Sequence, residues 1–362
     1  MKKNKKNILL LLSIICCCLC CSTQAKAQEV SNNNEEIIVS PELQQGVVVL
    51  ETPTSIVYNM GMLPARKLTE NNLFFENPTN PYKELKTPAQ IKRLGNYYFI
   101  VDCYHNQVIY SHKLDAPLKN WKVMTKDVNL PHSVDSDGKV YLVADTENHR
   151  VLVFEWKNGR FQNTQCLENI GERPHYIEYD EQTQSFYVWS SMTGEMYILK
   201  REPVTGIVCI QEIRQIRELA DFYVRSFTLV GEDILFPSGD NCYMIIADKT
   251  TLEVKGRFPV TEEIAGMAFV EPIGNYFYIT VSTDLSYNQN CATMIRTKDI
   301  NSLAIGEYEE IYNKFSAKGV PYYIDNINGL YYVTNHGSGK SVLRFGVEND
   351  TMCHVGYLRL SE

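Results

Sequence analysis

The chain has 362 residues, and 43 acidic against 35 basic side chains give it a formal net charge of −8 at neutral pH. An acidic protein repels the phosphates of nucleic acids and the head groups of anionic membranes, so neither partner is expected. Eleven cysteines in a chain of this length do not make a small disulfide-stapled scaffold.

Residues 1–27 have the three parts of a secretory signal peptide. Four lysines among the first six residues precede the apolar run 8–21, and Ala25-Lys26-Ala27 offers a small-residue cleavage site. We therefore expect an exported protein that is periplasmic, secreted or on the outer surface. A lipid anchor at Cys20 or Cys21 is the alternative, although neither cysteine follows the small residue that lipoprotein signals show. No later segment approaches the roughly 18 apolar residues of a membrane-spanning helix.

Removal of this leader changes the composition of the remaining chain. It takes away 27 of the 362 residues, five lysines and five cysteines, and leaves 335 residues, six cysteines and a formal charge of −13. Residues 28–87 then form a lead-in, with a polar tether at 31–36 and short predicted strands at 47–50 and 55–58. These strands are candidates for helping to close the domain that follows.

A regular repeat begins at Pro88. Six units start at about residues 88, 131, 174, 221, 265 and 318, and they are spaced roughly 43 to 53 residues apart. Each unit has a short opening strand, a Gly or Asp turn, a strongly apolar second strand, a third strand and a more polar fourth strand. The predicted second strands are 97–101, 140–144, 186–189, 234–236, 276–280 and 330–334.

Residues 131–154 show the repeat most clearly. Asp137-Gly138 is a dipeptide typical of tight hairpin turns. Asp145 starts a second turn, since its side chain can accept hydrogen bonds from the backbone amides that follow. Asn148 is expected to supply the left-handed conformation that this reversal needs, so that 151–154 can return as the next strand.

Units of this length cannot each bury two sheet faces alone, so they must pack against one another. Radial packing predicts an all-β fold over residues 88–362, a six-bladed β-propeller of four-stranded antiparallel blades. A right-handed β-helix is the competing architecture, but its coils would be shorter and would lack hairpin turns.

Two stretches of the second unit resemble an NHL repeat, namely Pro131-His132-Ser133-Val134 and Asp145-Thr146-Glu147-Asn148-His149-Arg150-Val151. Residues 101–108 repeat the second stretch loosely, so the resemblance covers about two of six blades. The Pro-His openings at 131–132 and 174–175 are similar to those of peptidylglycine amidating lyases, in which histidines at blade entrances hold zinc. The outline also resembles gluconolactonase-like propellers.

The first residues of the innermost strands are expected to ring one mouth of the central channel. Alignment of the units on Val134 gives the ring Ala89, His132, His175, Arg225, Met267 and Tyr322. Arg225 offers a planar fork for a carboxylate, the histidines titrate near neutrality, and Tyr322 presents a flat face and a hydroxyl. This set predicts a ligand-binding site for a small anionic molecule, a polyol such as a carbohydrate, or a peptide.

The same residues permit a metal site or a purely structural role. A catalytic zinc needs three protein ligands, and the ring supplies only His132 and His175, next to a repelling Arg225. We therefore assign no cofactor firmly, with zinc or calcium as the candidates. In the structural alternative, the histidines bond backbone carbonyls and Arg225 pairs with Asp221 or Glu178.

Three functions follow from this sequence. The first is an exported propeller that binds a small-molecule, carbohydrate or peptide ligand at the channel mouth. The second is a metal-dependent lyase or lactonase at the same mouth. The third is a scaffold that binds a protein partner through its rim. The sequence does not establish whether the protein is an enzyme.

Overall fold

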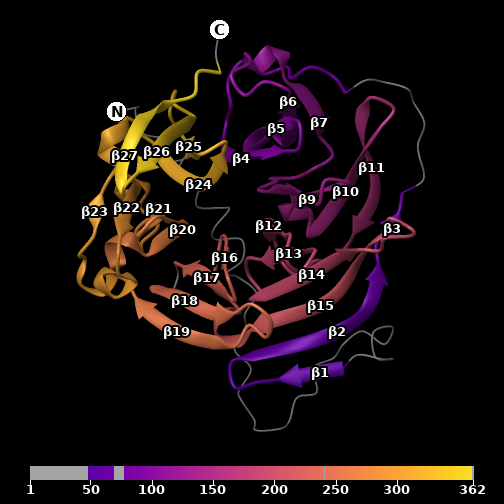
Figure 1. The fold of residues 1–362 in the computed structure, drawn as a ribbon, viewed down its shortest axis with the longest axis horizontal. Helices are drawn as coiled ribbons and strands as arrows, with labels where there is room; N and C mark the ends of the chain where they lie inside the picture. Colours follow the sequence, from indigo (N-terminus) through magenta and orange to yellow (C-terminus); the bar gives the residue numbers. More distant parts are fainter. Residues whose placement is uncertain (1–47, 69–76, 240, 361–362) are drawn as a thin grey trace, which may run out of the picture. The chain divides into compact units, whose positions relative to one another are not determined.

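The computed structural model describes residues 48–68, 77–239 and 241–360. The predicted signal peptide and the polar tether lie outside these ranges. The described residues belong to one compact unit, in which six antiparallel sheets surround a common centre (Figure 1). The prediction of an all-β, six-bladed propeller is confirmed.

Each blade contains four consecutive strands, ordered from the innermost to the outermost. Blade one has β4 (Pro88–Leu94), β5 (Tyr97–Asp102), β6 (Gln107–Ser111) and β7 (Lys122–Thr125). Blade two has β8 (Val134–Ser136), β9 (Val140–Asp145), β10 (Arg150–Lys157) and β11 (Arg160–Leu167). Blade three has β12 (Pro174–Asp180), β13 (Ser185–Ser190), β14 (Glu195–Arg201) and β15 (Val208–Ile216).

The second half of the ring repeats this order. Blade four has β16 (Thr228–Val230), β17 (Asp233–Ser238), β18 (Tyr243–Asp248) and β19 (Val254–Pro259). Blade five has β20 (Gly266–Ile273), β21 (Tyr276–Thr283), β22 (Thr293–Thr297) and β23 (Glu309–Glu310). Blade six has β24 (Val320–Ile327), β25 (Leu330–His336), β26 (Val342–Glu348) and β27 (Thr351–Tyr357).

Helical structure in the described chain is limited to short 3-10 turns between strands. They are η1 (Cys103–His105), η2 (Leu118–Asn120), η3 (Thr146–Asn148), η4 (Arg217–Leu219), η5 (Glu262–Ile264), η6 (Gln289–Cys291), η7 (Ile300–Ile305) and η8 (Tyr312–Phe315). Across the described ranges, no helix has the length and apolar character needed to cross a membrane.

The lead-in adds strands to the outer edges of two blades. β2 (Ser55–Pro64) pairs antiparallel with β15, and β1 (Val48–Glu51) pairs with β2, so the sheet of blade three has six strands. β3 (Arg66–Lys67) pairs with β11 in blade two. These additions cover outer strand edges that would otherwise expose unpaired backbone groups.

The ring closes between blade six and blade one, and β1 and β2 lie elsewhere. The Thr334 hydroxyl donates a hydrogen bond to the carbonyl of Ala89 at 2.8 Å, and β24 and β25 both contact β4. Near the end of the chain, the Leu360 carbonyl accepts a hydrogen bond from the Leu118 amide at 2.9 Å. Each blade is therefore a continuous stretch of sequence, and side-chain and terminal contacts close the seam.

Turn chemistry explains why the second unit is so regular. The Asp137 carboxylate accepts hydrogen bonds from the amides of Lys139 and Val140, both at 2.8 Å. Gly138 has a φ of +82°, which a residue without a Cβ adopts without strain. The predicted hairpin turn is therefore present between β8 and β9.

The second turn differs from the prediction at Asp145 and at Asn148, because the Asp145 side chain accepts no hydrogen bond from the backbone amides of the turn that follows it. The buried Asp145 carboxylate accepts hydrogen bonds from the Asn129 amide at 2.6 Å and from Asn148 Nδ2 at 2.9 Å. The left-handed residue is His149, with a φ of +52°, and not Asn148. The prediction for Asn148 was wrong because its amide group is held by the carboxylate while the reversal occurs one residue later.

Aromatic side chains fill the space between neighbouring blades. Trp189 of blade three lies 4.6 Å from Phe236 of blade four, and Tyr278 of blade five stacks on Phe345 of blade six at 5.4 Å between ring centroids. All four side chains are fully buried. Burial of each such ring contributes about 1.5–3 kcal/mol, so packing between blades is a main source of stability.

Candidate functional site

The blade openings bring two histidines face to face at one end of the central channel. His132 precedes β8, and His175 lies in β12, on neighbouring blades. Their rings stack with centroids 3.9 Å apart and an interplanar angle of 28°. Beside them, the Ser133 hydroxyl accepts a hydrogen bond from the Ile177 amide at 3.1 Å, which fixes the register of the two innermost strands.

Hydrogen bonds determine which nitrogen of His175 carries the proton. Its Nδ1 lies 2.8 Å from the carbonyl oxygen of Arg225, and a carbonyl can only accept. Nδ1 is therefore protonated, and Nε2 is left as an acceptor. The Tyr223 hydroxyl lies 2.9 Å from Nε2 and donates to it.

His132 carries its proton on the same ring nitrogen, Nδ1. Its Nδ1 lies 2.8 Å from the carbonyl oxygen of Leu130 and 3.1 Å from the Thr146 hydroxyl. Its Nε2 faces the Cys103 thiol at 3.7 Å. Both rings therefore bond backbone carbonyls, as the structural alternative predicts, and both direct an unprotonated Nε2 away from those carbonyls.

The histidines at this mouth are neutral at physiological pH. Burial, followed by the Arg173 guanidinium, lowers the pKa of His132 to about 3. Burial and the neighbouring His132 hold the pKa of His175 well below its usual value. Burial also lowers the pKa of His336, the last residue of β25 in blade six, to about 4. The imidazoles therefore act as hydrogen-bonding groups and contribute no positive charge.

Arg225 brings a second guanidinium to the mouth besides Arg173, which pairs with Glu147 at 2.9 Å. The Arg225 side chain is only 8% exposed, lies 4.6 Å above the Tyr223 ring and approaches the Met267 carbonyl at 3.5 Å. Among the ion pairs of the described residues, none joins Arg225 to a carboxylate, so it pairs with neither Asp221 nor Glu178. A buried charge without a partner of opposite sign is costly, which makes this guanidinium a natural anion receptor.

The structure also places Tyr322 with this group. Its ring centroid lies 6.2 Å from that of His132 and 6.4 Å from that of His175. Its hydroxyl is 3.5 Å from His175 Nε2. The four predicted site residues, His132, His175, Arg225 and Tyr322, thus occupy one mouth.

Sequence reasoning missed three side chains of this mouth, Tyr223, Arg173 and Cys103. Tyr223 precedes Arg225 by two residues, whereas Arg173, two residues before His175, has a φ of +63° and is not extended. Residues two apart on an extended chain point to the same side. This spacing was therefore a usable signal for Tyr223, whereas Cys103 reaches His132 from the turn of another blade and gave none.

Three aromatic rings fill the channel between the histidines and its opposite half. Tyr176, Phe269 and Tyr323 lie 4.9 to 5.5 Å apart between centroids and are at most 3% exposed. The Tyr323 hydroxyl donates to the Arg225 carbonyl at 2.9 Å. The histidine mouth is therefore a closed-end site and not one end of an open pore.

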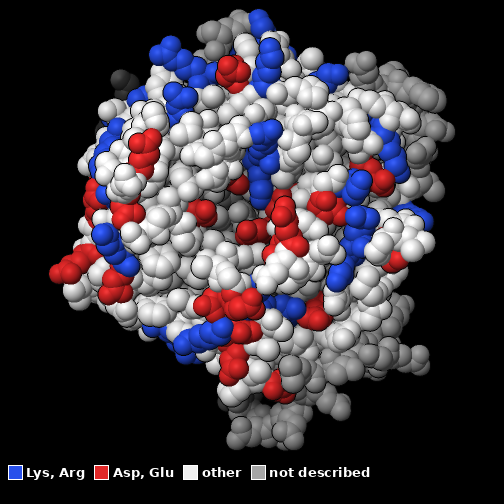
Figure 2. All heavy atoms as spheres, in the orientation of Figure 1, with Lys and Arg blue, Asp and Glu red and all other residues white. Residues whose placement is uncertain are grey.

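A second group of charged side chains lies on the other side of these rings, and sequence reasoning missed it entirely. Five innermost strands contribute Lys92, Asp135, Glu178, Glu271 and Asp325. Lys92 Nζ lies 2.7 Å from Asp135 Oδ2. On the face drawn in Figure 2, acidic side chains border the hollow at the centre of the ring.

The spacing of these acids along the chain explains their position. Asp135, Glu178 and Asp325 each lie three residues after a ring residue. Side chains three apart normally face opposite sides of a strand, but β12, where it pairs with β13, and β24, where it pairs with β25, each contain a bulge at the blade opening, which explains Glu178 and Asp325. The extra residue lets both positions face the channel.

Crowding of these carboxyls changes their acidity. Burial raises the pKa of Glu178 to about 8, against an opposing effect of Lys92. Burial and the nearby Glu178 raise the pKa of Glu271 to about 8. Burial raises the pKa of Asp325 to about 7. Glu178, Glu271 and Asp325 therefore hold protons near neutral pH, chiefly because they are buried.

A cleft of about 870 Å³ opens at the seam between blades six and one. Asn335 and Pro88 line it and flank the contact in which His336 Nε2 lies 2.9 Å from the Pro88 carbonyl oxygen. The His336 ring in turn lies 4.8 Å from that of Tyr322, so this residue separates the cleft from the histidine mouth. The other lining residues of the cleft include three cations, Lys83, Lys86 and Arg359, and one carboxylate, Glu84. A cationic cleft on an acidic protein favours a negatively charged ligand.

Residues 129–154 match the NHL repeat family. The chain carries an NHL repeat in a six-bladed β-propeller. The predicted resemblance at this unit is confirmed, and the match coincides with the blade that supplies His132. A search of curated protein sequences finds no significant match.

Solved structures share the fold of this NHL-containing propeller at low sequence identity. Virginiamycin B lyase from Staphylococcus aureus, an inactive variant with quinupristin, has a TM-score of 0.51 and 11% identity over 82% of this chain and 88% of the other. The periplasmic gluconolactonase of Pseudomonas aeruginosa has a TM-score of 0.50 and 10% identity over 74% and 84%. Hydrazine synthase from Kuenenia stuttgartiensis has a TM-score of 0.51 and 15% identity over 76% of this chain and 80% of the other. These similarities show the fold alone.

The imidazole pair of the NHL-containing propeller does not fit a shared metal ion as it is arranged. An ion bound by an imidazole lies in the plane of the ring, about 2.0–2.1 Å from the nitrogen for zinc. Two nearly parallel rings stacked 3.9 Å apart offer no point that lies in both planes at that distance. Within the described ranges, His132 and His175 also belong to no group of three possible ligands within 4.8 Å.

Proposed function

We propose that the histidine mouth binds a small ligand that carries a carboxylate, such as a uronic acid sugar or an acidic peptide, in an exported protein. The observation that carries this proposal is Arg225, a buried guanidinium with no carboxylate partner among the described residues. A ligand carboxylate would supply the missing charge through a two-pronged hydrogen bond.

The surrounding groups support a ligand with hydroxyls or amides beside its acid. Tyr223 and Tyr322 present hydroxyls around His175 Nε2. Neutral imidazoles can exchange hydrogen bonds with a polyol or a peptide without repelling a cationic neighbour. The adjacent cleft with Lys83, Lys86 and Arg359 could hold further acidic units of a longer ligand.

A second candidate is a lyase or lactonase at the same mouth, which the similarity to virginiamycin B lyase and a gluconolactonase favours. A general base works best with a pKa near the operating pH. The pKa of His175 lies well below this range, chiefly because the ring is buried. We therefore rank binding above catalysis. Turnover of an aldonolactone above the buffer rate, lost in His175→Ala, would reverse that order.

The test of the binding proposal compares galacturonate with galactose, which lacks the carboxylate. We expect galacturonate to bind the parent protein in calorimetry and to raise its unfolding temperature, and galactose to do neither. Arg225→Ala should weaken galacturonate binding at least about tenfold, since a charged hydrogen bond contributes about 1.5–3 kcal/mol. An acidic dipeptide tests the peptide alternative in the same assay.

Arg296→Ala is the matched control. Arg296 is equally buried at 8% exposure, but it pairs with Glu309 at 2.6 Å and lies in blade five, outside the mouth. It should keep galacturonate affinity unchanged. Equal affinities in Arg225→Ala and the parent would refute the proposal. Export is tested separately, because the mature protein should then lack residues 1–27 by mass spectrometry.

A further inference from the structure

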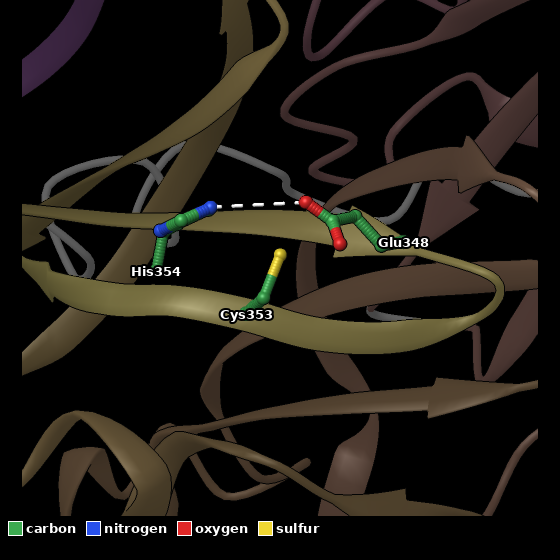
Figure 3. Close-up of side chains that lie close together, drawn as sticks. All are labelled: Glu348, Cys353 and His354. Atoms are coloured by element: carbon green, nitrogen blue, oxygen red, sulfur yellow. Dashed lines mark ion pairs between the residues drawn. The ribbon is translucent and has the colours of Figure 1, made fainter.

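The last hairpin of the propeller brings three chemically different side chains together. β26 and β27 are the outer strands of blade six, and Glu348, Cys353 and His354 lie close to the turn between them. The carboxylate, thiol and imidazole ligand atoms all lie within 4.8 Å of one another (Figure 3). Among the described residues, this is the one group of three such side chains that meets this distance.

The backbone explains how two consecutive residues can share one face of the sheet. Neighbouring side chains on a regular strand point to opposite faces. Here the pairing of β26 with β27 shifts between Arg344 and Gly346, and His354 has a φ of +52°. The distortion turns the imidazole of His354 to the side on which Cys353 already lies, as Figure 3 shows.

Gly346 provides the space that this arrangement needs. A Cβ at this position would lie 3.0 Å from the Cys353 sulfur and 3.2 Å from Cδ2 of His354. Glycine weakens the interior of a strand, and its use there often marks a close approach by another group. Glycine at position 346 of β26 therefore leaves room for the side chains of Cys353 and His354, which pack over it.

We propose that Glu348, Cys353 and His354 form a zinc site with a fourth position open to water. Thiolate, imidazole and carboxylate are the three ligand types that zinc accepts, and about 2.0–2.3 Å bonds in a tetrahedron place ligand atoms about 3.3–3.8 Å apart. His354 Nε2 and Glu348 Oε1 are already 3.8 Å apart. Cys353 Sγ points toward the space between them (Figure 3).

The exposure of these side chains allows the site to close around an ion. The Glu348 and His354 side chains are 74% and 65% exposed, so small rotations do not disturb the core. The site lies on the outer strands of blade six and contains no residue of the histidine mouth. It is therefore independent of the proposed ligand-binding function.

Cobalt(II) is the probe, because a cobalt–thiolate bond gives a charge-transfer absorption that carboxylate and imidazole ligands do not give. With the reduced full-length mature protein, we expect one equivalent of cobalt to produce this band and zinc to displace it. Cys353→Ser should abolish the band. His354→Asn keeps a residue that tolerates a positive φ and should weaken cobalt binding at least tenfold, as should Gly346→Ala.

Two cysteine variants serve as controls. Cys291 is a partly exposed thiol 3.4 Å from an Asp284 carboxylate oxygen, so Cys291→Ser should retain the band and the affinity. Cys103 lies 3.7 Å from His132 Nε2, so Cys103→Ala tests whether the metal binds at the channel mouth instead. A band that survives Cys353→Ser, or one that is lost in Cys103→Ala, would overturn the proposal. So would the absence of a band in the parent protein.

Discussion

His175 donates a hydrogen bond from Nδ1 to the main-chain carbonyl of Arg225 at 2.8 Å, and this contact joins blade three to the opening of blade four. The same carbonyl accepts the Tyr323 hydroxyl from blade six. One buried imidazole thus connects three blades across the mouth. The guanidinium of Arg225 makes only a long hydrogen bond to the Met267 carbonyl at 3.5 Å and a contact with the Tyr223 ring, and among the described residues it has no carboxylate partner.

Replacement of His175 by alanine should destabilise the propeller. The substitution leaves a cavity in a fully buried site and removes a partner of Tyr223 and Tyr323. We expect a loss of about 2–4 kcal/mol in the free energy of unfolding, measured in urea. His175→Phe keeps the stacked ring and should lose less. A change below about 0.5 kcal/mol in His175→Ala would contradict this role.

The sequence predicts the mouth better than the rest of the channel, and the reason lies in the alignment. Alignment of the units on Val134 placed His132 and His175 at equivalent positions of neighbouring blades. The acids Glu178 and Asp325 were missed because a regular strand would turn them away from the channel, and the bulges that turn them inward leave no clear mark in the sequence.

Contacts between segments that lie far apart in the chain are the second feature that could not be predicted from the sequence. The seam contact between Thr334 and Ala89 joins the last blade to the first, and no local pattern specifies it. The lead-in strand Ser55–Pro64 was expected as a short strand, but its apolar residues do not reveal that it pairs with β15. Turn chemistry is local, and even there His149 took the conformation expected of Asn148.

Acid should destabilise the protein partly through His132. Its pKa is lowered from 6.5 to about 3, chiefly by burial. Above pH 6.5 the ring is neutral in both states and the full stability is present. As the pH falls below 6.5, the unfolded chain binds a proton that the folded chain does not, and stability falls by about 1.4 kcal/mol per pH unit.

His132→Gln removes this titration. The stability difference between pH 7 and pH 5, measured by urea unfolding, should be smaller in this variant than in the parent. His112, which is exposed, offers the control, and His112→Gln should leave the difference unchanged. The same loss with acid in His132→Gln and the parent would show that the ring is not held neutral.

The carboxyls of the opposite half of the channel should act in the other direction. The pKa of Glu178 is raised from 4.5 to about 8 by burial. Below pH 4.5 the group is protonated in both states, so its contribution to stability is greatest there. Between pH 4.5 and 8 the unfolded chain ionises first, and the stability contribution is progressively lost.

Glu178→Gln should therefore raise the free energy of unfolding at pH 8 by about 1–3 kcal/mol and change it little at pH 4.5. Glu172→Gln, at an exposed position just before β12, is the control and should have little effect at either pH. A Glu178→Gln variant that is less stable than the parent at pH 8 would show that Lys92 fully compensates the ionised carboxylate.

Asp145 should be the most sensitive turn residue of the second blade. Its fully buried carboxylate accepts the Asn129 amide and Asn148 Nδ2 and pairs with Arg150 Nε at 2.6 Å. Asp145→Ala removes the acceptor of the Asn129 amide and leaves the Arg150 guanidinium without its main partner, which should cost about 3–5 kcal/mol. Asp127 contacts the same Arg150 at 3.6 Å, but its side chain is 81% exposed. Asp127→Ala should cost less than about 1 kcal/mol because water already screens that pair.

Urea unfolding of both variants separates the hydrogen-bonding role of Asp145 in the turn from its ion pair with Arg150. Similar losses of stability in the two variants would mean that the ion pairs of Arg150, and not the buried turn network, determine the stability of this blade.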